Sequence, residues 1–433
     1  MVDLRPFRGW RYDFDVVGDP ASVLCPPYDL ITPEMQESLR RLNPYNVVHL
    51  EAGEGLDWNA TAKDQYSGTA NLFEEWTRKG VLLRDTEPCC YLLRQVFQHQ
   101  GREWSRLGLT ACVRLETYED RRVLPHEYTE SPAIRDRVSL MEACGANFSP
   151  IMSLYRDAEE DLAPIFRQVM SGHPVLDVRE LAEQRTTLWR VFESELLEPI
   201  HRFFLDRQVF LADGHHRYEA ALQYRQKANS QSAGAPDPNE ASNFVMMTLI
   251  GFENPGLLVL PYHRLLGGLS MDQAAQVQER LYQIFEPTSV VPGDRGGYGL
   301  VEQVAHMGQG RHALGMVGPN NAETACLLTL REGVDWQQWG PLGVSEAWIL
   351  EERVLKPVLG TATLGHLGYI HDHREAVGLV ASGARQMAFL LKPFPMDQFE
   401  SIVGEGQRLP RKSTFFYPKL PTGLVINQLG GSL

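Results

Sequence analysis

The chain has 433 residues, of which 43% are hydrophobic, so it can bury an ordinary core spread over two or three structural units. This composition excludes a disordered chain. Its 55 acidic and 41 basic residues give a formal net charge of −14, which disfavours binding to a nucleic acid unless a local basic patch overrides it.

The first six residues lack the charged start and apolar core of a secretory signal, and no apolar run approaches the length of a membrane span. We therefore expect a cytoplasmic protein without a membrane partner. No two of the six cysteines show C-x-x-C spacing, so neither a zinc ribbon nor a redox dithiol is indicated. We interpret them as reduced thiols that mostly pack: Cys25, Cys89, Cys90, Cys112, Cys144 and Cys326.

Residues 1–120 are predicted to form an N-terminal α/β region. After an irregular opening rich in proline and aromatic residues, a helix begins at Thr32 and a second helix ends at Lys79-Gly80. From Cys90 to Leu115 apolar residues alternate around a turn at Gln100-Gly101, which predicts a β-hairpin. Its inward-facing candidates are Tyr91, Leu93, Phe97, Leu109, Ala111 and Val113.

Residues 121–265 are predicted to form the central region of the chain. A polar, irregular stretch over 124–155 is of the kind that often carries function. The small-residue segment 229–238 predicts a flexible surface loop. Between and beyond them we expect a helix at 196–204, a strand at 209–212, a helix at 218–227, and strands at 244–250 and 257–260.

Residues 266–433 are predicted to form a C-terminal α/β region, and no internal repeat is evident. A hairpin is expected across the turn Gly318–Asn321. The expected helices are 274–284, 345–359, 375–380 and 397–403, and the expected strands are 368–371 and 387–391.

The segment Asp213-Gly214-His215-His216-Arg217 joins the predicted strand 209–212 to the helix that follows. A buried strand that feeds a helix presents unpaired backbone N–H groups at the positive end of the helix dipole, where anions bind. Gly214 allows a tight turn, the two histidines and Arg217 add donors, and Asp213 could meet a metal ion or a substrate hydroxyl. The segment therefore predicts a phosphate-binding turn.

Two other interpretations of this turn stay open. In the first, Asp213 caps the helix while His215, His216 and Arg217 are solvated or paired with carboxylates. In the second, the two histidines bind zinc, although adjacent positions of a helical turn diverge by about 100°, which makes a shared ion awkward. The metal at this site is left unknown.

Seven short stretches together resemble one family, over nearly the whole chain. The chain is similar to the bacterial and archaeal domain-of-unknown-function family 1015, often labelled ParB-like. The matching stretches are Phe7–Trp10, Pro26–Asp29, Pro44–Val47, Leu124–Glu127, Ala212–Glu219, Leu260–Arg264 and Lys412–Lys419.

The resemblance implies an α/β (α+β) fold. It would have a ParB/sulfiredoxin-like core with mixed sheets and flanking helices, plus additional N- and C-terminal α/β elements. Members of that superfamily bind nucleotide phosphates at a Gly-x-x-Arg turn. Sulfiredoxin needs a cysteine directly after the glycine, where this chain has His215, so sulfinic-acid repair is not supported. The partitioning CTPases have Glu-Arg in place of His215-His216, and no basic helix-turn-helix segment follows here.

The free-serine kinase of the superfamily resembles this chain in an Asp-Gly-His-His-Arg turn and an upstream Pro-His-Glu. Carried over, Glu127 would take the proton from the serine hydroxyl and Asp213 would be a second catalytic carboxylate. Gly214, His215, His216 and Arg217 would hold the nucleotide phosphates. ATP or ADP would be the donor, with Mg²⁺ as the expected ion, since phosphoryl transfer needs an oriented hydroxyl, a carboxylate and cations.

We therefore predict a nucleotide-dependent phosphotransferase acting on a small hydroxyl metabolite, with free serine as the leading substrate. One alternative is a phosphatase for phosphoserine or a related monoester, with water as the nucleophile. Another is a non-catalytic, ParB-like nucleotide-binding regulator. The sequence identifies neither the donor among ATP, ADP, CTP and pyrophosphate nor the oligomeric state.

Further residues are weaker candidates. His126 and Arg137 lie in the polar central stretch, and Lys412 and Ser413 lie in a basic segment near the C-terminus that could contact a phosphorylated ligand. Interpretations without a functional role also stay open: Glu127 could be a solvated carboxylate or the partner of a nearby arginine, and the C-terminal segment could be edge-strand packing. The histidines at 366, 371 and 373 have spacing that could suit a metal, but a solvent-exposed strand end explains them as well.

Overall fold

The computed structural model describes residues 1–52, 66–179, 184–231, 237–290, 298–307, 311–319 and 325–433. The chain divides into two compact units. Unit 1 comprises Met1–Leu258 and Pro418–Leu433, and unit 2 comprises Val259–Tyr417. The sequence instead indicated three regions, with boundaries near 120 and 265. The first of these boundaries does not separate compact units, because strands from both sides of it share one sheet.

Unit 1 is built around a nine-stranded sheet in the order β6-β11-β8-β12-β5-β4-β10-β9, with β1 also paired to β5. Two strand pairs, β6 with β11 and β8 with β12, are parallel and the others are antiparallel. The predicted α/β fold with mixed sheets is therefore confirmed. The strands are β1 Leu4–Arg5, β4 Cys90–His99, β5 Arg102–Arg114, β6 Val123–Leu124, β8 Ile151–Tyr155, β9 Leu176–Arg179, β10 Arg185–Val191, β11 Val209–Asp213 and β12 Phe244–Gly251.

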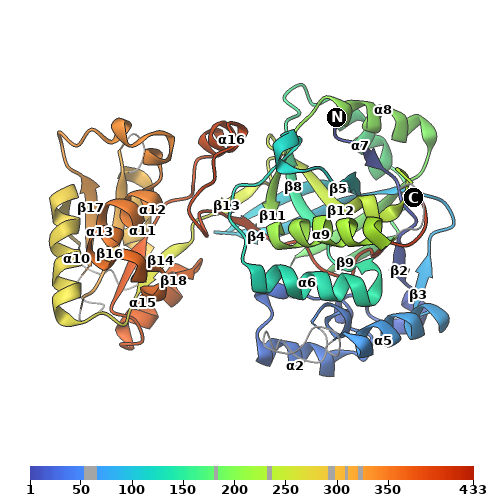
Figure 1. Ribbon diagram of the computed structural model, residues 1–433, viewed down its shortest axis with the longest axis horizontal. Coiled ribbons are helices and arrows are strands. Elements are labelled where there is room, and N and C mark those ends of the chain that lie inside the picture. Colours follow the sequence, from blue (N-terminus) through green and yellow to red (C-terminus); the bar gives the residue numbers. More distant parts are fainter. Residues whose placement is uncertain (53–65, 180–183, 232–236, 291–297, 308–310, 320–324) are drawn as a thin grey trace. The chain divides into compact units, whose positions relative to one another are not determined.

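Helices cover this sheet. Figure 1 shows α9 lying across the central strands, with α6 beside it and α2 and α5 beyond. Apolar side chains of α6, α7, α8 and α9 share one buried cluster with those of the sheet. The longer helices of unit 1 are α2 Pro33–Leu42, α5 Ser67–Arg78, α6 Ser131–Cys144, α7 Ala163–Met170, α8 Ser194–Leu205 and α9 His215–Gln231, with the short α1 Phe14–Val17 and α3 Val48–Glu51.

The predicted hairpin is confirmed as β4 and β5, joined at Gln100-Gly101, where both residues have positive φ. The predicted inward side chains, however, do not share one face. Tyr91 lies opposite Thr110, whereas Leu92 lies opposite Leu109, so the odd-numbered candidates of the two strands point to opposite faces. Alternation of apolar residues could not predict which face each side chain occupies. Residues 90–93 are all buried, and both faces of the sheet are covered.

Unit 2 is a six-stranded antiparallel sheet in the order β15-β17-β16-β19-β14-β18. Its strands are β14 His263–Leu266, β15 Phe285–Ser289, β16 Ala313–Val317, β17 Ala325–Leu330, β18 Leu367–Ile370 and β19 Met387–Leu390. Neighbouring residues such as Leu265 and Leu266 belong to separate apolar clusters, so both faces are covered. The helices include α10 Met271–Ile284, α11 Tyr298–Met307, α14 Thr363–His366, α15 His373–Ala381 and α16 Met396–Gly404, and a continuous α-π-α helix over 346–359.

The described residues also form three two-stranded sheets. They pair β2 Trp10–Tyr12 with β3 Leu82–Arg84, β7 Ala146–Asn147 with β21 Asn427–Gln428, and β13 Leu258–Leu260 with β20 Phe415–Tyr417. The long helix after the turn runs on to Gln231, into the segment predicted as a flexible loop, while residues 232–236 of that loop lie outside the described residues. Residues 320–324, at the predicted hairpin turn of unit 2, also lie outside them.

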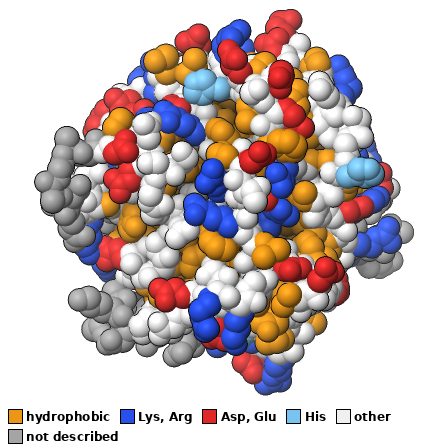
Figure 2. Space-filling view, turned by 90° about the vertical axis from the view of Figure 1, so that its right-hand side faces the viewer, with side chains coloured by type: hydrophobic (Ala, Val, Ile, Leu, Met, Phe, Trp, Pro, Cys, Tyr) orange, Lys and Arg blue, Asp and Glu red, His pale blue; other side chains and the backbone are white. Residues whose placement is uncertain are grey.

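None of the helices in the described residues is both long enough and apolar enough to cross a bilayer. Figure 2 shows one face, where basic, acidic and apolar side chains are interspersed and several Lys and Arg gather near the centre of the view. On this face the negative net charge of the chain therefore does not produce a uniformly acidic surface.

Candidate functional site

The predicted turn joins a buried strand to a long helix. β11 ends at Asp213 and α9 begins at His215, with Gly214 between them at φ +95°. The first bond of the helix runs from the Tyr218 N–H to the Gly214 carbonyl, so the N–H groups of residues 215–217 precede the helical hydrogen-bond ladder. A Cβ at Gly214 would lie 2.9–3.1 Å from guanidinium atoms of Arg217. Both the φ angle and this close approach require glycine.

Asp213 lies between two cations. Its Oδ2 accepts from Arg217 Nη2 at 2.9 Å, and its Oδ1 accepts from Lys419 Nζ at 2.6 Å. The three side chains are 10–17% exposed, so the cluster is mostly shielded from water. Two cations therefore contact this one carboxylate at the N-terminus of a helix, in a cluster formed by Asp213, Arg217 and Lys419.

Arg217 braces the turn from inside. Its Nη1 donates to the Pro150 carbonyl at 2.5 Å, in the loop before β8, while Nη2 binds Asp213. Its Nε is buried and has no hydrogen-bond partner in the described part of the chain. The guanidinium therefore fixes the shape of the turn with two of its nitrogens and retains one unused donor.

Lys419 reaches Asp213 from the C-terminal end of the sequence. Its position follows from the buried side chains of Arg106 and Gln95 in the β4–β5 hairpin. Arg106 Nη2 donates to the Pro418 carbonyl at 2.6 Å, and Gln95 Nε2 donates to the Lys419 carbonyl at 3.4 Å. Burial lowers the pKa of Arg106 to about 9, which still leaves it a cation near neutral pH.

The loop that carries Glu127 is hydrogen-bonded to the two histidines of the turn. The His126 N–H donates to Nε2 of His215 at 3.2 Å, and the Glu130 N–H donates to Nε2 of His216 at 3.0 Å. A ring nitrogen that accepts a hydrogen bond carries no proton, so Nε2 is the acceptor nitrogen of each imidazole. The histidines thereby hold the predicted Pro-His-Glu segment against the predicted phosphate turn.

His126 and Glu127 lie beside this contact. The His126 ring packs edge-on against His215, with centroids 4.5 Å apart, and its Nδ1 lies 2.6 Å from the Leu211 carbonyl. Burial lowers the pKa of His126. One carboxylate oxygen of Glu127 lies 3.7 Å from His126 Nε2, and its side chain is 19% exposed, which leaves it accessible to a small molecule.

Arg137 belongs to a buried network behind the turn. It donates to Tyr66 Oη, to the Asp136 carboxylate and to the Glu51 carbonyl, and its guanidinium lies 4.2 Å from the centroid of the Tyr28 ring. A cavity of about 30 Å³ lies between Arg137 and Arg217, which is room for one or two waters. The network therefore supports the turn from behind.

The family model described as "Protein of unknown function (DUF1015)" matches residues 4–345. The chain belongs to this family. The predicted family resemblance is thereby confirmed. Among curated proteins nothing matches this chain.

Three similar solved structures show how far the likeness extends. A free serine kinase variant in complex with ADP is 12% identical, and the match covers 68% of this chain and 83% of that one at a TM-score of 0.35. A conserved hypothetical protein from Pyrococcus furiosus is 13% identical, with 70% and 90% covered and a TM-score of 0.35. SbnI from Staphylococcus aureus, truncated at its C-terminus, is 11% identical, with 75% and 87% covered and a TM-score of 0.36.

Only some of the seven stretches that resemble the family lie close to the turn at 213–217. Tyr28, from the stretch Pro26–Asp29, packs under Arg137, and burial raises the pKa of its hydroxyl. The stretches Leu124–Glu127 and Ala212–Glu219 meet through the histidines described above. Lys412 and Ser413, by contrast, belong to unit 2, where Ser413 Oγ donates to the Pro410 carbonyl at 2.6 Å and Lys412 Nζ lies 5.2 Å from the centroid of the Tyr262 ring.

The sequence analysis did not single out Lys419, which contacts Asp213 in the structure. It stands seven residues after Lys412 in the same family stretch, so the stretch itself was the available signal. The spacing alone gave no reason to prefer one lysine over the other. Only the crossing of the chain back into unit 1 at Pro418 brings Lys419 to Asp213.

Proposed function

We propose that this protein is a nucleotide-dependent phosphotransferase that phosphorylates a small hydroxyl metabolite, with free serine as the leading substrate. One observation carries the proposal. Hydrogen bonds from the backbone of residues 126–130 to His215 and His216 place the Glu127 loop against a turn with the charge and amides of a phosphate site.

In this proposal the N-terminal amides of α9 and the Lys419 ammonium meet the negative charge of the nucleotide phosphates. Asp213 keeps Lys419 in place through its 2.6 Å contact, and Arg217 fixes the turn. Phosphates would draw on the same positive charge that now balances Asp213, since cations and oriented dipoles are the main requirement of phosphoryl transfer.

Glu127 is the proposed general base. The substrate hydroxyl oxygen attacks the terminal phosphorus of the donor, and the new O–P bond forms as the bond from phosphorus to the nucleotide oxygen breaks. Glu127 takes the hydroxyl proton, a role that suits a carboxylate that is partly exposed beside His126. The departing nucleotide keeps the electron pair of the broken bond.

The part of the chain that the structure describes offers no ready-made site for the expected Mg²⁺. No group of three or more His, Cys, Asp or Glu side chains in the described ranges is arranged to hold a metal ion. Both oxygens of Asp213, the nearest acidic ligand at the turn, already accept from Lys419 and Arg217. We therefore assign no step to a resident metal.

The test is formation of phosphoserine from serine and ATP or ADP, followed by phosphorus NMR. Glu127→Gln should lower kcat by about 10²–10⁴-fold, the usual contribution of a general base, with nucleotide affinity retained. Lys419→Met should instead weaken nucleotide binding. The matched controls are Glu119→Gln and Lys356→Met, which change exposed residues and should leave the rate unchanged.

Three other results would contradict the proposal. If Glu127→Gln and Asp213→Asn both kept the full rate, the assigned chemistry would be wrong. If phosphate were released from phosphoserine without any nucleotide, the turn would instead serve a phosphatase. Nucleotide binding with no turnover of any hydroxyl substrate would favour a regulator.

A further inference from the structure

A second pocket opens in unit 1, at the far end of β8 from the turn. Asp213 pairs with Met152 on β8, whereas the pocket lies at Tyr155, three residues along that strand and therefore about 10 Å away. Its volume is about 230 Å³, and none of its lining residues belongs to the Asp213 cluster. The pocket is thus separate from the site of the proposed phosphotransferase.

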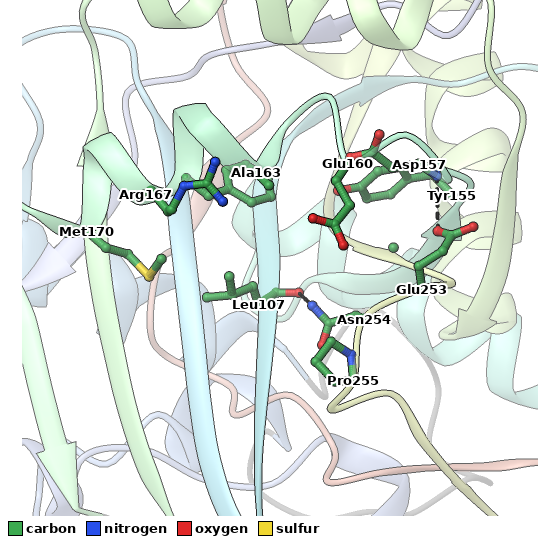
Figure 3. A pocket seen from close by; sticks show the side chains of 12 residues that line it. Leu107, Tyr155, Asp157, Glu160, Ala163, Arg167, Met170, Glu253, Asn254 and Pro255 are labelled. Carbon is green, nitrogen blue, oxygen red and sulfur yellow. Dashed lines mark hydrogen bonds between the residues drawn. The ribbon is translucent and has the colours of Figure 1, made fainter.

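The walls of this pocket are mainly apolar. Figure 3 shows Leu107 and Met170 along one side, with Ala163 and Arg167 on the helix above them. Phe166, also in α7, is buried. An apolar cavity of 150 Å³ is known to hold a molecule as large as benzene, so this one suits a body of about six to ten non-hydrogen atoms.

The opposite end of the pocket is acidic. Figure 3 shows Glu160, Asp157 and Glu253 gathered there around Tyr155. Asp157 caps the start of the following helical segment, accepting from the N–H groups of residues 161 and 162. Glu253 accepts from the Asp157 N–H at 3.1 Å and pairs with Arg156 at 3.2 Å. Glu160 has no side-chain partner in the described ranges.

Tyr155 provides the observation that points to a ligand. The residue is 3% exposed, yet its hydroxyl makes no hydrogen bond with any described residue. Its oxygen is not among the fully enclosed atoms that lack a partner, so it keeps some accessible surface, and Tyr155 lines the pocket. The pocket beside Tyr155 supplies the space for a partner, and the neighbouring carboxylates make a positively charged donor the best match.

We propose that this pocket binds a small primary ammonium ion with an apolar chain of about six carbons. The ammonium group donates to the Tyr155 hydroxyl oxygen and to the carboxylates of Glu160 and Glu253, while the chain lies along Leu107, Phe166 and Met170. Arg167, which has no partner among the described residues, lies at the other end and disfavours a second positive charge there.

The experiment compares n-hexylamine, 1-hexanol and hexanoate at neutral pH, using saturation-transfer NMR and calorimetry on the full chain. Hexylamine should bind at least about tenfold more tightly than hexanol, because the charge-assisted hydrogen bonds are lost in the alcohol, and hexanoate should bind least. Equal binding of hexanoate and hexylamine, or no hexylamine binding at millimolar concentration, would overturn the proposal.

Variants locate the binding. Ala163→Phe fills the pocket from the surface of α7 and should abolish hexylamine binding, whereas Gln168→Phe, on the same helix but outside the pocket, should not. Glu160→Gln should weaken binding by about three- to tenfold, with Glu159→Gln as its matched control. Hexylamine binding that survives Ala163→Phe unchanged would show that the amine binds elsewhere. None of these results depends on phosphotransfer, so the two proposals can fail separately.

Discussion

The turn in unit 1 and a buried cluster in unit 2 both pair an arginine with a carboxylate, but the two arginines differ in how completely they are hydrogen-bonded. In unit 2, Arg264 is fully buried and all three guanidinium nitrogens are bonded: Nε to Glu351 at 2.8 Å, and the others to the carbonyls of residues 262, 411 and 412. At the turn, two cations share Asp213, and Arg217 Nε has no partner among the described residues. A fully hydrogen-bonded polar cluster stabilises a structure, whereas one that keeps a spare donor can also bind a ligand.

The largest effect expected from this comparison is on Arg264. Arg264→Ala should lower the free energy of unfolding by about 3–5 kcal/mol, because it leaves the largely buried Glu351 and three carbonyls without this fully buried partner. Urea denaturation followed by circular dichroism would measure this loss. A double variant, Arg264→Met with Glu351→Leu, should recover part of it, since no unpaired charge remains. If Arg264→Ala cost less than about 1 kcal/mol, the cluster would not be the structural element described here.

The same contrast explains what could be predicted from the sequence. The turn at 213–217 is local, so the strand, the glycine and the following helix could be predicted from one short segment, although the helix begins at His215 and not at the predicted residue 218. The long helix and hairpin were legible for the same reason. The partners of that turn were not, because Pro150, His126 and Lys419 come from distant segments and meet only through the sheet topology. The two compact units divide the chain differently from the three predicted regions, because chain order does not show that the last sixteen residues return to unit 1.

Gly214 gives the next largest expected effect. Gly214→Ala should cost about 1–3 kcal/mol, because its φ of +95° is strained for any residue with a Cβ and that atom would meet Arg217. The displaced Arg217 should also weaken nucleotide binding. Thermal unfolding and nucleotide titration would be measured together, with Gly101→Ala as the control, because its positive φ carries the same strain with no neighbour within 4 Å. Equal nucleotide affinity in both variants would separate the turn from the phosphate site.

His263, beside Arg264, should make the free energy of unfolding depend on pH. Burial lowers its pKa to about 3 from an ordinary 6.5, and its Nδ1 accepts from the Leu391 N–H at 3.1 Å. The unfolded chain therefore binds the proton more readily, so the contribution of His263 is complete above pH 6.5 and is lost as the pH falls towards 3. The expected loss is about 1.4 kcal/mol per pH unit over that range. The difference in urea stability between the native chain and His263→Gln should shrink with this slope, and a constant difference would contradict it.

The smallest effects distinguish the two histidines of the turn. His215→Ala removes the acceptor of the His126 N–H, and His126 is 1% exposed, so the buried N–H is left unpaired at a cost of about 1–3 kcal/mol. His216→Ala removes the acceptor of the Glu130 N–H, which lies near solvent and can bind water instead, so it should cost about 0.5 kcal/mol or less. Denaturation of the two variants side by side measures the difference.

The outcome separates the roles of the two histidines. If His215 stabilises the chain as Arg264 does while His216 does not, then His215 mainly holds the Glu127 loop in place. A loss of activity in His216→Ala would then report on ligand contact alone. Equal and large losses of stability for both would instead make the whole turn a structural element like the Arg264 cluster.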